Sequence, residues 1–172
     1  ERGIEGYVNR LLRRIKPVPL ANLFDILPLL AVAKEPLDPA AIKVMLNKGR
    51  SGLTKQCILE ALESASLFVK PNSSGRWSYR HGLYQSVFSK GEGFNTIAET
   101  RKTDLLEWCA EWESQIPPHP YALRYYVVHL HDKAPDNLEP LFELARSQHF
   151  FDAQMAQFTD DPLVAVETTE RA

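Results

Sequence analysis

Cysteine and long apolar runs are scarce in this chain of 172 residues. The two cysteines, Cys57 and Cys109, lie far apart and form no C-x-x-C pair. The sequence therefore predicts neither a disulfide framework nor a zinc site, but two small buried residues in a reducing compartment. No apolar run approaches the ~20 residues that cross a bilayer, and charges occupy the positions where a signal peptide has its apolar segment. These absences predict a cytoplasmic protein with no membrane partner.

A surplus of positive charge is also lacking. The formal net charge is -2, with 20 lysines and arginines against 22 aspartates and glutamates. Such a balance gives no general attraction to phosphate backbones, so nucleic acid is not the expected partner. Hydrophobic residues make up 44% of the chain, which is enough for one packed domain or two small ones.

Motifs of catalysis are missing as well. The chain has no G-x-x-x-x-G-K-[ST], hence no cradle of backbone N–H groups and no lysine for nucleotide phosphates. Ser86 has no G-x-S-x-G around it, and neither cysteine has an evident histidine partner. The sequence therefore predicts no enzyme activity and no tight ATP binding by this chain alone.

Apolar residues at helical spacing predict an N-terminal connecting helix within residues 1–18, followed by further helices. The basic face of the first helix is expected to be a solvated surface, with membrane or nucleic-acid binding as the alternative. A wide apolar stripe over residues 20–31 predicts a mostly buried second helix with a kink or short break at Pro28. Asp38 is the expected N-cap of the next helix, and Thr54 or Ser51 caps the one after it.

Two runs of strand formers, residues 67–70 and 76–80, flank the turn-forming segment PNSSG and predict a β-hairpin. Three helices followed by a hairpin is the order of a winged helix, and we assign residues 19–92 to such a domain. The fold alone does not give its function, because winged helices bind DNA or other proteins.

A winged helix that reads DNA presents cations and amides on its third helix and more cations on its hairpin. In this chain the candidates for phosphate or base contact are Lys55 and Gln56 on the helix and Lys70, Arg76 and Arg80 on the hairpin. The carboxylates of Glu60 and Glu63 lie beside them and oppose such contact. A DNA-binding regulator with a helical dimerisation tail is therefore an alternative rather than the leading hypothesis.

No strand pattern follows Phe94. Apolar spacing predicts helices in succession over residues 97–112, 123–130, 138–145 and 151–158, and the short turns between them predict antiparallel helical hairpins. Residues 93–172 are assigned to this region, with a loosely ordered tail after Pro162. The expected fold class is therefore mainly α, a winged helix followed by helical hairpins. A plain helical-repeat scaffold is a further alternative for the whole chain.

The second half also offers histidines and aromatic residues. His129 and His131 are two apart and point to different faces of a helix, so a shared metal with Asp132 is not favoured. His119 and His149 are expected beside the N-termini of helices. Two aromatic pairs four residues apart are expected to pack in the core or between hairpins: Trp108 with Trp112, and Tyr121 with Tyr125. An exposed aromatic stripe would instead indicate a groove for a partner.

His81 lies in RWSYRHGLYQSVF, where the spacing changes from that of a strand to that of a helix. One interpretation is structural: the imidazole caps the following helix or bonds a nearby carbonyl. The other is functional: the imidazole donates a hydrogen bond to a phosphate oxygen of a ligand.

The run LPLLAVAKEPLDPAAIKVML, followed by a helix, a hairpin and WSYRHGLYQSVF, resembles the winged-helix domain of STAND-class NTPases of the NACHT and NB-ARC type. The segments HPYALRYYVVHLHDKA and LFELARSQHFFDAQMAQF are similar to the TPR-like helical hairpins that follow it in bacterial members. The resemblance extends from Leu23 to Phe158.

The resemblance implies a conformational switch. STAND proteins hold a nucleotide between a P-loop domain and the winged helix, whose histidine contacts the ADP phosphates in the resting state; His81 matches that position. It implies a non-catalytic signalling segment, with the upstream nucleotide-binding domain of the same chain and a protein ligand or effector as partners. ADP or ATP would be bound by the parent protein. This chain should hold no cofactor alone, because one such hydrogen bond contributes only about 1.5–3 kcal/mol, which corresponds to affinity weaker than millimolar.

Overall fold

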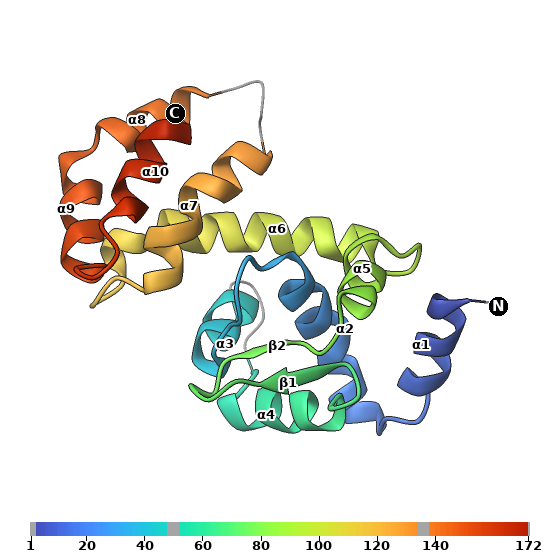
Figure 1. Cartoon of the computed structure of the whole chain (residues 1–172). Coiled ribbons are helices and arrows are strands. Elements are labelled where there is room, and N and C mark those ends of the chain that lie inside the picture. The colour runs from blue at the N-terminus through green and yellow to red at the C-terminus, as the bar shows by residue number, and fades with distance from the viewer. Residues whose placement is uncertain (1–2, 48–51, 134–137, 172) are drawn as a thin grey trace. The chain divides into compact units, whose positions relative to one another are not determined.

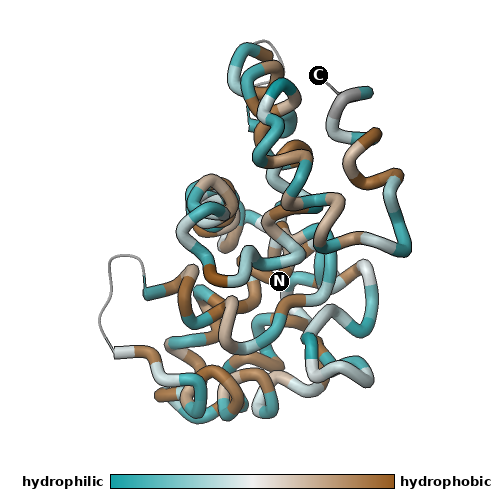
Figure 2. Tube along the Cα trace, turned by 90° about the vertical axis from the view of Figure 1, so that its left-hand side faces the viewer, coloured by the Kyte–Doolittle hydropathy of each residue, from teal (hydrophilic) through white to brown (hydrophobic). Residues whose placement is uncertain are grey.

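The computed structural model describes residues 3–47, 52–133 and 138–171. The described chain is mainly helical, with one small antiparallel sheet of two strands (Figure 1). It divides into two compact units, residues 1–105 and 106–172. Along most helices hydrophobic and hydrophilic positions alternate, as expected of helices that bury one face (Figure 2).

The first unit follows the order expected from the sequence. Its elements are α1 (Ile4–Leu12), α2 (Pro17–Val32), α3 (Pro39–Asn47), α4 (Lys55–Ser64), β1 (Val69–Pro71), β2 (Trp77–Tyr79), α5 (Gly82–Lys90) and the first part of α6 (Asn95–Ala110). The three helices α2, α3 and α4 therefore precede a hairpin, as predicted.

The division between the units falls inside α6, later than the boundary after residue 92 that the sequence indicates. Aromatic packing explains the difference. The ring of Phe94 lies 5.9 Å from that of Phe24 and 4.7 Å from that of Phe88, and Arg101 pairs with Asp25 of α2 at 3.8 Å. The start of α6 therefore packs with the first unit.

Local capping places the starts of α3 and α4. The Oδ1 atom of Asp38 accepts hydrogen bonds from the backbone N–H groups of Ala40 and Ala41, each at 2.9 Å. The Thr54 hydroxyl accepts from the N–H of Cys57 at 3.1 Å. Both predicted caps are confirmed, and the other candidate, Ser51, lies outside the described residues.

Helix α2 provides much of the core of the first unit. Five of its large apolar side chains are almost fully buried: Leu23, Ile26, Leu27, Leu29 and Leu30. They pack against α4 and α5. The helix continues through Pro28, so the short break, one of the two outcomes expected there, does not occur. Residues 26–32 are all buried, and this packing stabilises the helix enough to tolerate the loss of the hydrogen bond that proline cannot donate.

The hairpin pairs Val69 with Tyr79 and Pro71 with Trp77. Its turn uses Gly75 at φ 74°, a left-handed conformation that suits glycine. Trp77 also exchanges two backbone hydrogen bonds with Leu37, at 2.7 and 3.1 Å. The segment between α2 and α3 is thus tied to the outer side of β2, a pairing that the sequence did not predict.

The second unit contains the end of α6, the 3-10 turn η1 (Trp112–Ser114), α7 (Pro120–Lys133), α8 (Glu139–Arg146), α9 (Gln148–Gln157) and α10 (Leu163–Arg171). Helix α7 packs against α8, α9 and α10. Trp108, Trp112 and Tyr121 are buried, so their expected role in the core is confirmed. Tyr125 is half-buried, with its ring 4.9 Å from that of Tyr121.

The expectation of a loose tail after Pro162 differs from the structure, which has α10 in that place. Val164, Ala165 and Thr168 are buried on one face of this helix. The Nε2 atom of the buried Gln154 donates to the Thr168 hydroxyl at 2.9 Å and to the Leu123 carbonyl at 2.7 Å. The hydropathy pattern does not predict α10, because the buried face of this helix is narrow and includes the polar residue Thr168.

Candidate functional site

His81 follows the hairpin and is the N-cap of α5. Its backbone is extended, at φ -149° and ψ 138°, and its Nδ1 atom accepts a hydrogen bond from the N–H of Leu83 at 3.1 Å. The predicted capping role is therefore confirmed. The side chain is exposed, so the imidazole is not sealed in the core.

The capping bond determines where the ring can donate. Because Nδ1 accepts from Leu83, the proton of the neutral imidazole is on Nε2. Within the described residues, no group is hydrogen-bonded to that Nε2 atom. The exposed residue therefore keeps one N–H donor available, and the structural and functional interpretations of His81 are compatible.

A shallow pocket of about 230 Å³ adjoins His81 in the first unit. It is lined by the end of α2, the following turn, β2 and the start of α5: Leu30, Ala33, Lys34, Glu35, Pro36, Trp77, Ser78, Tyr79, Arg80, His81, Gly82 and Gln85. The pocket is smaller than the ~300–1,000 Å³ typical of sites that enclose a ligand.

The charge around this pocket is mixed. Lys34, Arg80 and His81 provide cationic or donor groups, whereas Glu35 opposes an anion. Arg76 is paired with Glu35 at 3.5 Å, and the Nε atom of Arg80 donates to the carbonyl of Ser66 at 2.6 Å. The pocket can therefore orient a phosphate by hydrogen bonding, with little net charge to attract it.

The candidate DNA-reading surface has the same limitation. On α4, Lys55 and Gln56 are exposed, but so are Glu60 and Glu63. Gln56 donates to Glu60 at 2.9 Å, which occupies its amide nitrogen. Of the hairpin cations, Lys70 is exposed while Arg76 is paired with Glu35. Carboxylates within the surface would repel a phosphate backbone.

The remaining histidines have local roles. His119 precedes α7 and accepts from the N–H of Tyr121 at 3.1 Å, and His149 lies at the start of α9 with Nδ1 3.2 Å from Glu113. Both therefore lie beside helix N-termini, as predicted. His129 is buried and His131 is exposed, which agrees with their expected positions on different faces.

The two cysteines differ in their burial. Cys109 is buried, and burial raises the pKa of its thiol far above the ordinary value, so the reactive thiolate is disfavoured. Cys57 is half-buried rather than fully buried as expected, and its sulfur lies 3.1 Å from the Thr54 hydroxyl.

The described ranges contain no cluster of three or more histidine, cysteine, aspartate or glutamate residues suited to a metal ion. They also contain no helix with the length and apolar character required to cross a bilayer.

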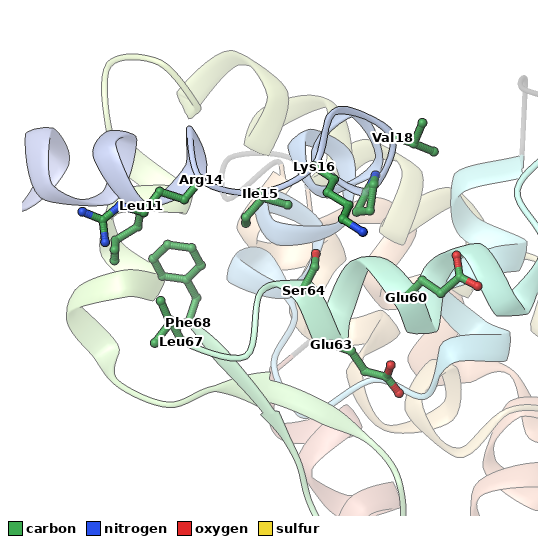
Figure 3. Close-up of a pocket in the computed structure, with 11 residues that line it drawn as sticks. Leu11, Arg14, Ile15, Lys16, Val18, Glu60, Glu63, Ser64, Leu67 and Phe68 are labelled. Atoms are coloured by element: carbon green, nitrogen blue, oxygen red, sulfur yellow. The ribbon is translucent and has the colours of Figure 1, made fainter.

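A larger groove lies in the first unit, between the α1–α2 junction and α4 (Figure 3). Its volume is about 740 Å³, and its lining is Leu11, Arg14, Ile15, Lys16, Val18, Pro19, Glu60, Glu63, Ser64, Leu67 and Phe68. Sequence reasoning did not indicate this groove. The available signal was two apolar residues at element boundaries, Val18 at the start of α2 and Leu67 between α4 and β1, where 77% and 61% of their surfaces are exposed.

Comparisons of the chain with protein families, curated proteins and solved structures found no match.

Proposed function

We propose that this chain is a non-catalytic regulatory segment of a cytoplasmic STAND-type signalling NTPase. In this proposal the first unit contains a winged helix that closes over a nucleotide held by the P-loop domain of the same protein. The second unit, the helical-repeat part, contacts a protein ligand or effector. The observation that supports the proposal is the exposed His81 at the end of the hairpin, whose Nδ1 is used in the cap while its Nε2 remains available as a donor.

The surrounding architecture favours a winged helix. The three helices α2, α3 and α4 lie directly before the hairpin, and the bridge between Leu37 and Trp77 adds a short third segment to the sheet. The capping bond to Leu83 holds the ring of His81 in one orientation before any ligand arrives. Preorganisation of this kind reduces the entropy lost when a phosphate is bound.

The mechanism is differential binding. A nucleotide shifts a conformational equilibrium only if it binds the two conformations unequally. A hydrogen bond from His81 to an ADP phosphate would exist only in the closed conformation. At about 1.5–3 kcal/mol it would favour closure by roughly ten- to 150-fold.

The reading frame that encodes the chain is the first test. A P-loop domain encoded in frame ahead of residue 1 supports the proposal. A reading frame without such a domain contradicts it.

The second test uses the complete protein. His81→Ala removes both the cap and the donor, whereas His81→Ser removes the donor and keeps a capping oxygen. Release of a fluorescent ADP analogue should accelerate about tenfold or more in both variants. His119→Ala, which removes a comparable cap in the second unit, should leave release unchanged. Normal release from His81→Ser would show that His81 acts only as a cap.

The DNA-binding alternative is tested separately. Binding of duplex DNA that weakens steeply with salt, and that is lost on Lys55→Ala, would favour the regulator. If the chain is instead a plain helical-repeat scaffold, the complete protein should bind its protein partner equally well with and without nucleotide.

A further inference from the structure

The groove between the α1–α2 junction and α4 is not used by the proposed function. All its lining residues belong to the first unit. Leu11 and Ile15 are half-buried, and Phe68 is almost completely buried, while Val18 and Leu67 are highly exposed. An apolar channel with an exposed apolar margin is typical of a surface that contacts another molecule.

The charges along the groove are separated by sign. Arg14 and Lys16 come from the α1–α2 side, and Glu60 and Glu63 come from α4 (Figure 3). All four side chains are exposed. Within the described part of the chain, Arg14, Lys16 and Glu63 form no ion pair. The groove is therefore cationic along one wall and anionic along the other.

The walls also restrict how a peptide can bind. One wall is helix α4 with the turn that follows it, and the other is formed by the end of α1, the turn after it and the start of α2. None of the lining residues belongs to a strand, so these walls offer no sheet edge to an extended peptide. A ligand must be recognised through side chains, which is the way an amphipathic helix binds in a groove.

We propose that this groove binds an amphipathic helix of a protein partner, with carboxylates along one edge of its apolar face and lysines or arginines along the other. The carboxylates would face Arg14 and Lys16, and the cations would face Glu60 and Glu63. The apolar face would cover Val18 and Leu67. This inference is independent of His81.

The probes are three fluorescein-labelled helical peptides with the same leucine face. The first has glutamates on one edge and lysines on the other, the second has glutamates on both edges, and the third has lysines on both. A peptide with its two charged edges exchanged would be no control, because it could bind in the reverse direction and present the same charges to each wall. The controls therefore have the same charge on both edges. Anisotropy should show the mixed peptide binding about three- to tenfold more tightly than either control, since each control repels one wall.

Charge reversal provides the decisive variant. Glu60→Lys together with Glu63→Lys makes both walls cationic, so the preference should shift to the peptide with glutamates on both edges. Glu92→Lys with Glu107→Lys changes the net charge equally outside the groove and should preserve the preference for the mixed peptide. An unchanged preference in the first pair, or equal binding of all three peptides, would overturn the proposal.

The apolar contribution is tested at the two exposed side chains. Val18→Ser with Leu67→Ser should weaken the mixed peptide about tenfold or more, and because both positions are exposed the fold should persist, as circular dichroism can check. Val44→Ser with Leu83→Ser, which alters exposed apolar residues elsewhere on this unit, should have no effect. If the chain instead self-associates in light scattering, and Val18→Ser with Leu67→Ser abolishes this, the occupant is a second copy and the proposal is wrong.

Discussion

The hydroxyl group of Tyr121 lies 2.9 Å from the Nε2 atom of His129, two turns along the same helix, α7. Both side chains are buried, with 0% and 5% of their surfaces exposed. A polar pair of this kind is stabilising while intact, and its disruption leaves a buried nitrogen without the hydroxyl group.

Tyr121→Phe should therefore lower the free energy of unfolding by about 1–3 kcal/mol, although it preserves the ring. Urea unfolding followed by circular dichroism measures the change. A cycle with His129→Leu and the double variant isolates the pair, and we expect a coupling of about 0.5–3 kcal/mol. Additive effects of the two substitutions would show that the bond contributes nothing.

Tyr79 gives a pH-dependent prediction. Its hydroxyl donates to the Leu27 carbonyl at 2.7 Å, and burial raises its pKa well above the ordinary value of 10.0. The unfolded chain therefore releases this proton more readily than the folded chain. The stability that Tyr79 provides is complete below about pH 10 and is lost as the pH rises above that value.

Tyr79→Phe should thus be less stable than the parent by about 0.5–1.5 kcal/mol at neutral pH, and this difference should shrink above pH 10. Denaturant titrations across the alkaline range measure it. Burial also raises the pKa of Tyr126, with a smaller contribution from Cys109. Tyr126 is present in both proteins, so it does not affect the comparison. A difference that stays constant with pH would contradict the assignment.

Features set by neighbouring residues were predictable from the sequence. The caps at Asp38 and Thr54 follow from local chemistry, and the hairpin follows from strand formers on either side of a turn. The same is true of the capping role of His81, which depends on an N–H group two residues away.

Features that join distant segments were not predictable. Leu37 and Trp77 form a backbone bridge, and no pattern of side chains in the sequence predicts it. Gln154 and Thr168 are polar residues in a core, and hydropathy assigns such residues to the surface. The groove requires Val18 and Leu67 to line one channel, although each by itself resembles an ordinary exposed apolar residue.

Gly91 ends α5 at a position that excludes a larger residue. A Cβ atom there would lie 2.4 Å from the Val87 carbonyl oxygen and 3.1 Å from a carboxylate oxygen of Glu5. Gly91→Ala should therefore destabilise the protein by about 1–3 kcal/mol, because the backbone must shift. Gly93→Ala is the matched control, since nothing lies within 4 Å of its added Cβ atom. Equal thermal denaturation midpoints for the two variants would refute this account.

The docking of α10 depends on Gln154, which is 1% exposed and donates to both Leu123 and Thr168. Gln154→Ala removes both hydrogen bonds and leaves a cavity beneath the helix, so α10 should open more often. Hydrogen exchange should be about tenfold or more faster for its amides, the change that a loss of 1.4 kcal/mol or more produces. Gln157→Ala changes the same residue type at an exposed position of α9 and should leave that exchange unaltered. Equal exchange in the two variants would mean that the apolar contacts of Val164 and Ala165 hold α10 without help from the buried amide.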